Sequence, residues 1–98
     1  MKFAYTIIYV ADVPETVAFY ETAFGLSCRM MHPSNQYAEM ETGGTALAFA
    51  DEGMAKSKGF SIAPNRAEDA AAGIEVAFVS DDVAASFAQA VDAGASPI

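Results

Sequence analysis

The N-terminal segment Phe3–Val10 consists almost entirely of β-branched and aromatic residues. Alternate residues of a strand point to opposite faces, and here both faces are apolar. This pattern predicts a strand that is buried on both sides. One of its faces would carry Phe3, Tyr5, Ile7 and Tyr9.

A helix is predicted next, and the sequence marks both of its ends. Asp12 is suited to cap the first turn, and Pro14 and Glu15 occupy positions that are favoured near a helix start. Gly25 can adopt the left-handed conformation that ends a helix. Between these signals, apolar residues recur at helical spacing and predict one buried stripe. The stripe consists of Val13, Val17, Tyr20 and Phe24.

Three short segments separated by turn signals follow the predicted helix. Residues 27–32 end at a Pro-Ser-Asn turn, residues 36–41 at Gly43-Gly44, and residues 45–50 at Asp-Glu-Gly. Such spacing predicts an antiparallel meander of three strands. The first half of the chain therefore predicts the order β-α-β-β-β.

The opening pattern returns after an irregular stretch. Residues 54–72 lack periodicity and predict a linker or a crossover. Residues 73–79 then predict a second strand, Asp81 or Asp82 a second helix cap, and Gly94 a second helix end. The strand-helix unit thus occurs twice, which indicates a duplication. The apolar stripe of the second helix would be Val83, Phe87, Ala90 and Val91.

These elements predict an α+β fold made of a repeated βαβββ module. Residues 1–53 form the first module, residues 54–72 the crossover, and residues 73–98 the strand and helix of a second, incomplete module. The predicted strand at 73–79 would leave an exposed edge, because the sequence ends at Ile98 before three further strands. We expect a second chain, or residues beyond Ile98, to cover that edge.

Composition and charge narrow the possible partners. The chain has 98 residues, 53% of them hydrophobic, which is enough for one modest core. Five basic residues against 13 acidic ones give a net charge of −8, which repels nucleic acid and anionic membranes, although such surfaces often serve solubility alone. No apolar run reaches the roughly 20 residues that span a bilayer. The single cysteine, Cys28, has no partner for an internal disulfide, so we expect a cytoplasmic protein.

The segment YVADVPETVAFYETAFGL resembles the glyoxalase / bleomycin-resistance / extradiol-dioxygenase superfamily, also called the vicinal-oxygen-chelate fold. The shared features are a strand, an Asp, a helix with the pair Phe19-Tyr20, and then Phe24-Gly25. The segment GIEVAFVSDDVAASFAQAVDAGA is similar to the family's second strand-helix opening. The resemblance implies a curled mixed sheet with helices on its convex face and a ligand cavity on its concave face. It also implies a homodimer, in which modules can be shared between subunits.

The resemblance also implies positions for metal ligands. Metal-dependent members carry a His on the first strand, a carboxylate on the fourth, a His or Glu on the fifth and a Glu on the last. These positions fall on Tyr5, Ala48 and Glu75, and the last lies beyond Ile98. Ala48 offers no donor, a tyrosine must lose a proton with a pKa of about 10, and one carboxylate alone does not hold a transition metal. We therefore predict no metal site and no cofactor.

We expect a metal-free protein that binds an unidentified small molecule, either amphipathic or cationic, on the concave face or at a dimer interface. Tyrosine hydroxyls offer directional hydrogen bonds in an apolar cleft, and Glu75 would act there as a base or lie solvated at its strand start. The predicted pocket consists of Tyr5, Ile7, Tyr9, Ala48 and Glu75.

No catalytic residue is assigned, because neither Cys28 nor the single histidine, His32, has a predicted partner for nucleophilic catalysis. One alternative is a metal-dependent lyase, isomerase or dioxygenase of the same superfamily that uses other ligands. Another is a subunit whose only role is association.

Overall fold

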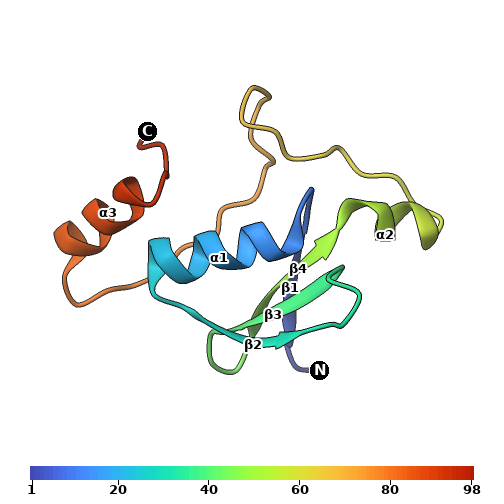
Figure 1. Ribbon diagram of the computed structural model, residues 1–98, viewed down its shortest axis with the longest axis horizontal. Helices are drawn as coiled ribbons and strands as arrows, with labels where there is room; N and C mark the ends of the chain where they lie inside the picture. The colour runs from blue at the N-terminus through green and yellow to red at the C-terminus, as the bar shows by residue number, and fades with distance from the viewer.

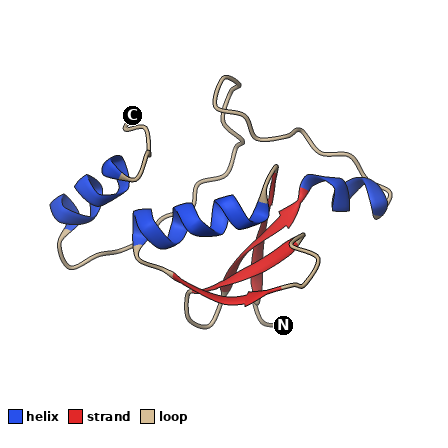
Figure 2. Cartoon of the chain, viewed as in Figure 1, coloured by secondary structure: helices blue, strands red, loops and turns tan.

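The computed structural model describes residues 1–98, which form one four-stranded sheet and three helices (Figure 1 and Figure 2). The predicted order β-α-β-β-β is confirmed for the first half of the chain. The elements are β1 Tyr5–Val10, α1 Val13–Phe24, β2 Ser27–Met31, β3 Tyr37–Glu41, β4 Ala46–Asp51, α2 Glu52–Ser57 and α3 Val83–Asp92.

The sheet is mixed, curled and unclosed, with the strand order β1-β4-β3-β2. β1 pairs with β4 in parallel, whereas β4, β3 and β2 form the predicted antiparallel meander. The parallel pair requires a crossover, which α1 and the meander provide. The fold class is therefore α+β, as predicted.

The two ends of α1 lie where the sequence predicts them. The Asp12 carboxylate caps the helix by accepting a hydrogen bond from the Glu15 backbone amide at 2.9 Å. Gly25 ends it with φ 67°, a left-handed conformation that costs a residue with a side chain additional energy.

The core lies between α1 and the sheet face that it covers. Val13 and Val17 of α1 are 1% and 4% exposed, and they pack on side chains from β3 and β4. Burying each large apolar side chain stabilises the fold by about 1.5–3 kcal/mol, so this layer holds the module together. The sheet side of the core consists of Ala38, Met40, Leu47 and Phe49.

The other face of the sheet is uncovered over much of β1, so the prediction that β1 is buried on both sides is wrong. Tyr5 and Ile7 are 48% and 43% exposed, and Phe3 lies before the strand at 71%. β1 is the edge strand of the sheet, and α1 supplies a layer on only one of its faces. One apolar face of β1 therefore packs against the core, and the other is exposed on the surface.

A short helix, α2, occupies the beginning of the stretch predicted to be irregular. The Asp51 carboxylate caps it by accepting from the Gly53 backbone amide at 2.8 Å. The chain then runs back past α1 without regular structure (Figure 1). Two contacts fix this crossover to the first module. Phe60 stacks edge-on against Tyr9, with ring centroids 5.8 Å apart, and Arg66 forms an ion pair with Glu52 at 2.7 Å.

The strand predicted at residues 73–79 does not form, because no neighbouring strand pairs with this segment. A strand is stabilised by backbone hydrogen bonds to a neighbour, and β-rich composition alone does not supply them. Aromatic packing holds the segment instead. The Phe78 ring lies 5.0 Å from that of Phe24 and 6.5 Å from that of Tyr20.

The second predicted helix is confirmed as α3, and its cap is Asp82 rather than Asp81. The Asp82 carboxylate accepts from the Ala85 backbone amide at 3.0 Å. α3 lies beside the C-terminal part of α1 (Figure 1), where Gln89 donates to the Thr22 carbonyl at 2.8 Å. None of the three helices combines the length and apolar character that crossing a bilayer requires.

Candidate functional site

The sheet face opposite α1 brings together most of the residues predicted to bind a ligand. Strand partners in register lie on the same face, so Ile7, Ala48 and Glu39 form one row across β1, β4 and β3. Equivalent rows run from Tyr5 and from Tyr9. We call this surface the open face and define it by Tyr5, Ile7, Tyr9, Ala46, Ala48, Ala50, Tyr37 and Glu39.

The middle of the open face is built from small residues. Ala46, Ala48 and Ala50 of β4 are 2%, 0% and 2% exposed, although α1 packs on the opposite face of the sheet. Larger side chains from β1 and β3 flank them in register. A ligand on this face would therefore contact the flanking side chains rather than β4 itself.

A three-residue polar network crosses the open face from β2 to β3. Arg29 donates to Glu39 Oε1 from Nη2 at 2.7 Å and from Nε at 3.2 Å. Tyr37 donates its hydroxyl proton to Glu39 Oε2 at 2.8 Å. Both carboxylate oxygens of Glu39 thus have partners within the protein, and the Glu39 side chain is only 13% exposed.

A β-bulge places Met30 on the open face beside Arg29. The register between β2 and β3 shifts between Cys28 and Met30, so Cys28 pairs with Met40 while Met30 pairs with Glu39. The extra residue is Arg29, which the register from Cys28 already places opposite Glu39, and the bulge sets Met30 opposite Glu39 as well. Regular alternation would have placed Met30 on the core side with Cys28.

The network shifts the proton affinities of its members. Hydrogen bonds from Arg29 and then Tyr37 lower the pKa of the Glu39 carboxyl below its ordinary value of 4.5. Burial, followed by the hydrogen bond to Glu39, raises the pKa of Tyr37 to about 12. The hydrogen bond to Glu39 likewise raises the pKa of Arg29, with smaller contributions from the charges of Glu41 and Tyr5. At neutral pH the network therefore consists of a carboxylate, a guanidinium and a neutral phenol.

The structure brings four of the five predicted pocket residues together and separates the fifth. Tyr5, Ile7, Tyr9 and Ala48 all lie on the open face. Glu75 lies in the unpaired segment 73–79, is exposed, and makes no hydrogen bond or ion pair. Glu75 has no strand register with Ala48, and it does not line the hollow at the β1 edge to which its neighbours Ile74 and Val76 contribute.

A hollow of about 590 Å³ lies at the free edge of β1, beneath the crossover. Ile7 and Tyr9 line it on the strand side, and Ile74 and Val76 line it on the crossover side. Ligand pockets commonly have volumes of about 300–1,000 Å³ and apolar walls, which this hollow matches. Its remaining walls come from Thr6, Ile8, Tyr20, Ile62, Ala63, Asn65, Ala71 and Ala72.

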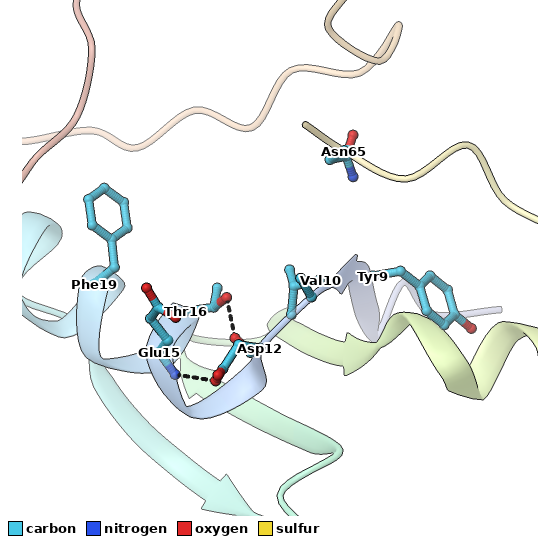
Figure 3. A pocket seen from close by; sticks show the side chains of 8 residues that line it. Tyr9, Val10, Asp12, Glu15, Thr16, Phe19 and Asn65 are labelled. Atoms are coloured by element: carbon cyan, nitrogen blue, oxygen red, sulfur yellow. Dashed lines mark hydrogen bonds between the residues drawn. The ribbon is translucent and has the colours of Figure 1, made fainter. Parts of the chain in front are cut away.

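A second hollow, of about 410 Å³, lies at the start of α1, opposite Asn65 (Figure 3). Two of its polar residues serve the helix start, since Asp12 accepts from the Glu15 amide and from the Thr16 hydroxyl. In Figure 3 the Tyr9 side chain points away from Asp12, consistent with its stacking on Phe60. The Asp12 carboxylate and the Thr16 hydroxyl of this hollow thus serve the fold.

The residues present do not fit the metal site that the resemblance implies. Ala48 offers no donor atom, Tyr5 is a phenol, and Glu75 lies outside the sheet. Glu39 is the carboxylate nearest in register to Ala48, but both of its oxygens are engaged. No group of three or more His, Cys, Asp or Glu side chains is placed to hold an ion.

Sequence reasoning missed Arg29 and Glu39 as functional candidates. The alternation of Tyr37, Glu39 and Glu41 against Ala38 and Met40 places Glu39 on the face away from the core, and this signal was available. Alternation along residues 27–31 likewise separates Arg29 from Cys28, whereas the bulge that turns Met30 to the open face has no comparable sequence signal. The walls that the crossover contributes to the β1 hollow were also missed.

Neither His32 nor Cys28 joins a catalytic arrangement. His32 Nδ1 lies 2.7 Å from the Ser34 hydroxyl and accepts from the Ser34 amide at 3.1 Å, within the turn between β2 and β3. Contacts between residues two positions apart are typical of a turn. Cys28 is a half-buried free thiol that packs against the core.

Comparisons with known proteins agree with this architecture. Among solved structures, an Arabidopsis thaliana gene product has a TM-score of 0.68 at 23% identity over 100% of this chain and 75% of its own. A glyoxalase/bleomycin resistance protein/dioxygenase family enzyme from Burkholderia phytofirmans has a TM-score of 0.68 at 19% identity, covering 96% of this chain and 74% of its own. TioX from Micromonospora has a TM-score of 0.60 at 19% identity, covering 97% and 74% respectively. At such identities the likeness shows the fold alone.

No curated protein matches the chain. The family model described as the Glyoxalase/Bleomycin resistance protein/Dioxygenase superfamily, by contrast, matches residues 2–98. The chain belongs to this superfamily.

Proposed function

We propose that this protein binds a small organic molecule, without a metal ion, on the open face and in the adjoining hollow at the β1 edge. The observation that carries the proposal is the exposure of Tyr5 and Ile7, at 48% and 43%, on a sheet face that presents no set of metal donors. Exposed aromatic and aliphatic side chains beside hydrogen-bonding groups are the usual components of a ligand site.

Binding without catalysis agrees with the chemistry of the surface. A general base or nucleophile needs a free, suitably placed group, yet both oxygens of Glu39 are hydrogen-bonded within the protein. The phenol of Tyr37 is held neutral by its raised pKa, about 12. The open face therefore offers a ligand apolar contacts and hydrogen-bond donors, which are suited to binding rather than to catalysis.

An NMR titration with a panel of aromatic compounds tests the proposal. A compound that binds should shift the signals of β1 and of the crossover that lines the hollow. Tyr5→Ala and Ile7→Ala should weaken its binding. Phe87→Ala is a matched control, because Phe87 is 57% exposed but lies on α3, away from the open face. Equal weakening by all three variants, or shifts confined to α3, would count against the proposed site.

A second candidate role is association, and one observation favours it. Val79, Val83 and Phe87 are 102%, 72% and 57% exposed, and they line an apolar hollow of about 510 Å³ between α1, α3 and the segment before α3. Contiguous exposed apolar surface commonly marks a protein contact. We propose a homodimer, with modules shared between subunits as one way to form it.

Sedimentation equilibrium at micromolar concentration tests the association. Val83→Lys and Phe87→Lys should shift the population toward monomer, whereas Tyr5→Lys on the open face should not. A wild-type protein that stays monomeric would remove this candidate.

Because Cys28 is a free thiol, we also propose a reducing compartment, the cytoplasm, as the protein's place of action.

A further inference from the structure

We propose that Arg29 selects the ligand on the open face, and that it selects molecules in which a carboxylate is attached to an apolar or aromatic body. The inference rests on the proposed function, because it names the ligand class for the same surface. Three observations support it: Arg29 has free N–H groups, Glu39 holds its guanidinium in place, and apolar side chains lie on the same face.

Arg29 uses one edge of its guanidinium and leaves the other free. Nε and Nη2 both donate to Glu39 Oε1, so the side edge is occupied. Nη1 has no partner, and Nη2 retains a second hydrogen. These hydrogens form the end edge, whose parallel N–H bonds match the two oxygens of a carboxylate.

The guanidinium is positioned before any ligand arrives. Glu39 is itself fixed, since its second oxygen accepts from Tyr37 at 2.8 Å. The Glu39 side chain is 13% exposed and that of Arg29 is 35% exposed, so the carboxylate is covered while the guanidinium still reaches solvent. Glu39 and Tyr37 are therefore positioning residues. Fixing a binding group in advance reduces the entropy lost when the ligand binds.

Apolar surface adjoins this polar edge. Met30 pairs with Glu39 in register and is 38% exposed, and across the face Tyr5 and Ile7 are 48% and 43% exposed. A ligand with its carboxylate on Arg29 could thus lay an apolar or aromatic body across these side chains. A simple carboxylate such as acetate would gain only the polar contact.

The same geometry disfavours a cationic ligand. The positive charge of Arg29 repels an ammonium group, and the Glu39 carboxylate that would attract one already accepts hydrogen bonds from Arg29 and Tyr37. The net charge of −8 opposes an anion at long range, yet exposed charges are screened beyond about 8 Å at physiological ionic strength. Contact with Arg29 acts well within that distance.

Three probes that share one ring system test the inference: naphthoate, naphthamide and naphthylmethylammonium. Their affinities are measured by NMR titration on the full chain. We expect naphthoate to bind wild type about tenfold more tightly than naphthamide, and the ammonium compound to bind most weakly. Arg29→Gln should bring naphthoate and naphthamide to within about twofold of each other, and Arg29→Lys should give an intermediate preference.

Control variants separate recognition from structural support. Arg66→Gln removes another ion-paired arginine, the partner of Glu52, and should leave the preference unchanged. Glu39→Gln should reduce the preference for naphthoate although Arg29 is still present. If the role of Arg29 were purely structural, Arg29→Gln would weaken the binding of all three probes equally, and that result overturns the inference.

The order of the three probe affinities for the wild-type protein tests the inference by itself, even if the Arg29 variants fold poorly. Equal binding of the three probes, or tightest binding of the ammonium compound, overturns carboxylate selection and leaves the proposed function standing. Binding of none of them removes both, because this surface would then hold no aromatic ligand.

Discussion

Val13 and Val83 are each the first residue after the aspartate that caps a repeated helix, yet Val13 is 1% exposed and Val83 is 72% exposed. The difference comes from what lies opposite each helix. α1 rests on the sheet formed by its own module, whereas the apolar stripe of α3 has no sheet against it. Equivalent sequence positions thus have opposite physical roles, one in the core and one on the surface.

Alanine substitutions should separate these two roles. Val13→Ala removes buried apolar atoms and leaves a cavity, so we expect it to lower the free energy of unfolding by about 2 kcal/mol. Val83→Ala should change it by less than about 0.5 kcal/mol, as exposed positions usually do. Urea denaturation of both variants measures the difference. Comparable losses would mean that the stripe of α3 is buried in solution, as it would be in a dimer.

The cap of α3 can be tested with two adjacent aspartates. Asp82→Ala removes the acceptor of the Ala85 amide, and we expect the stability of α3 to fall by about 1 kcal/mol. Asp81→Ala is the matched control, because Asp81 makes no such bond and lies one residue earlier. Amide hydrogen exchange along α3 reports the change locally. Faster exchange in Asp81→Ala than in Asp82→Ala would show that the cap is assigned to the wrong residue.

The network on the open face should make stability depend on pH with a definite sign. Folding lowers the pKa of Glu39 below its ordinary value of 4.5, because Arg29 and Tyr37 stabilise the carboxylate. The stabilisation is therefore complete above about pH 4.5 and is lost as the pH falls through the folded pKa. Wild type should exceed Glu39→Gln in stability at neutral pH, and the gap should narrow in acid. A gap that stays constant, or widens, in acid would show that Glu39 is not held as predicted.

Tyr37 should be the tyrosine that ionises at about pH 12. Burial and the hydrogen bond to Glu39 both favour its neutral form, so the stabilisation is present below the ordinary value of 10.0 and is lost as the pH rises through the folded pKa. Near-ultraviolet absorbance follows the ionisation of the tyrosines. Tyr37→Phe should remove this late step and leave the late ionisation of Tyr20, whose pKa is raised by burial. A late step that survives in full in Tyr37→Phe would belong to another tyrosine.

The sequence predicts those parts of the fold that depend on local signals. Asp12 and Gly25 bound α1 as expected, and the turns between the short strands are where Gly, Pro and Asn place them. The resemblance to the superfamily supplied the sheet architecture. These features depend on neighbouring residues and on periodicity, both of which are visible in one sequence.

Features that depend on distant partners could not be predicted in this way. The segment 73–79 has the composition of a strand, but pairing requires a neighbour that the sequence does not specify. The position of Met30 beside Arg29 depends on a bulge, which inverts the facing that simple alternation assigns to Met30. Of the predicted pocket, Glu75 was misplaced for the same reason, since its position assumed that 73–79 would be a strand.

Metal content tests the central claim most directly. Protein from cells grown with added Ni, Zn, Fe and Mn is purified without chelators, and its bound metal is measured by elemental analysis. Since the open face presents Tyr5 and Ala48 where donors would be needed, we predict well under about 0.1 equivalent of any transition metal. About one equivalent of a metal that is lost in Tyr5→Phe or Glu75→Gln would contradict the account and would indicate a metal-dependent enzyme.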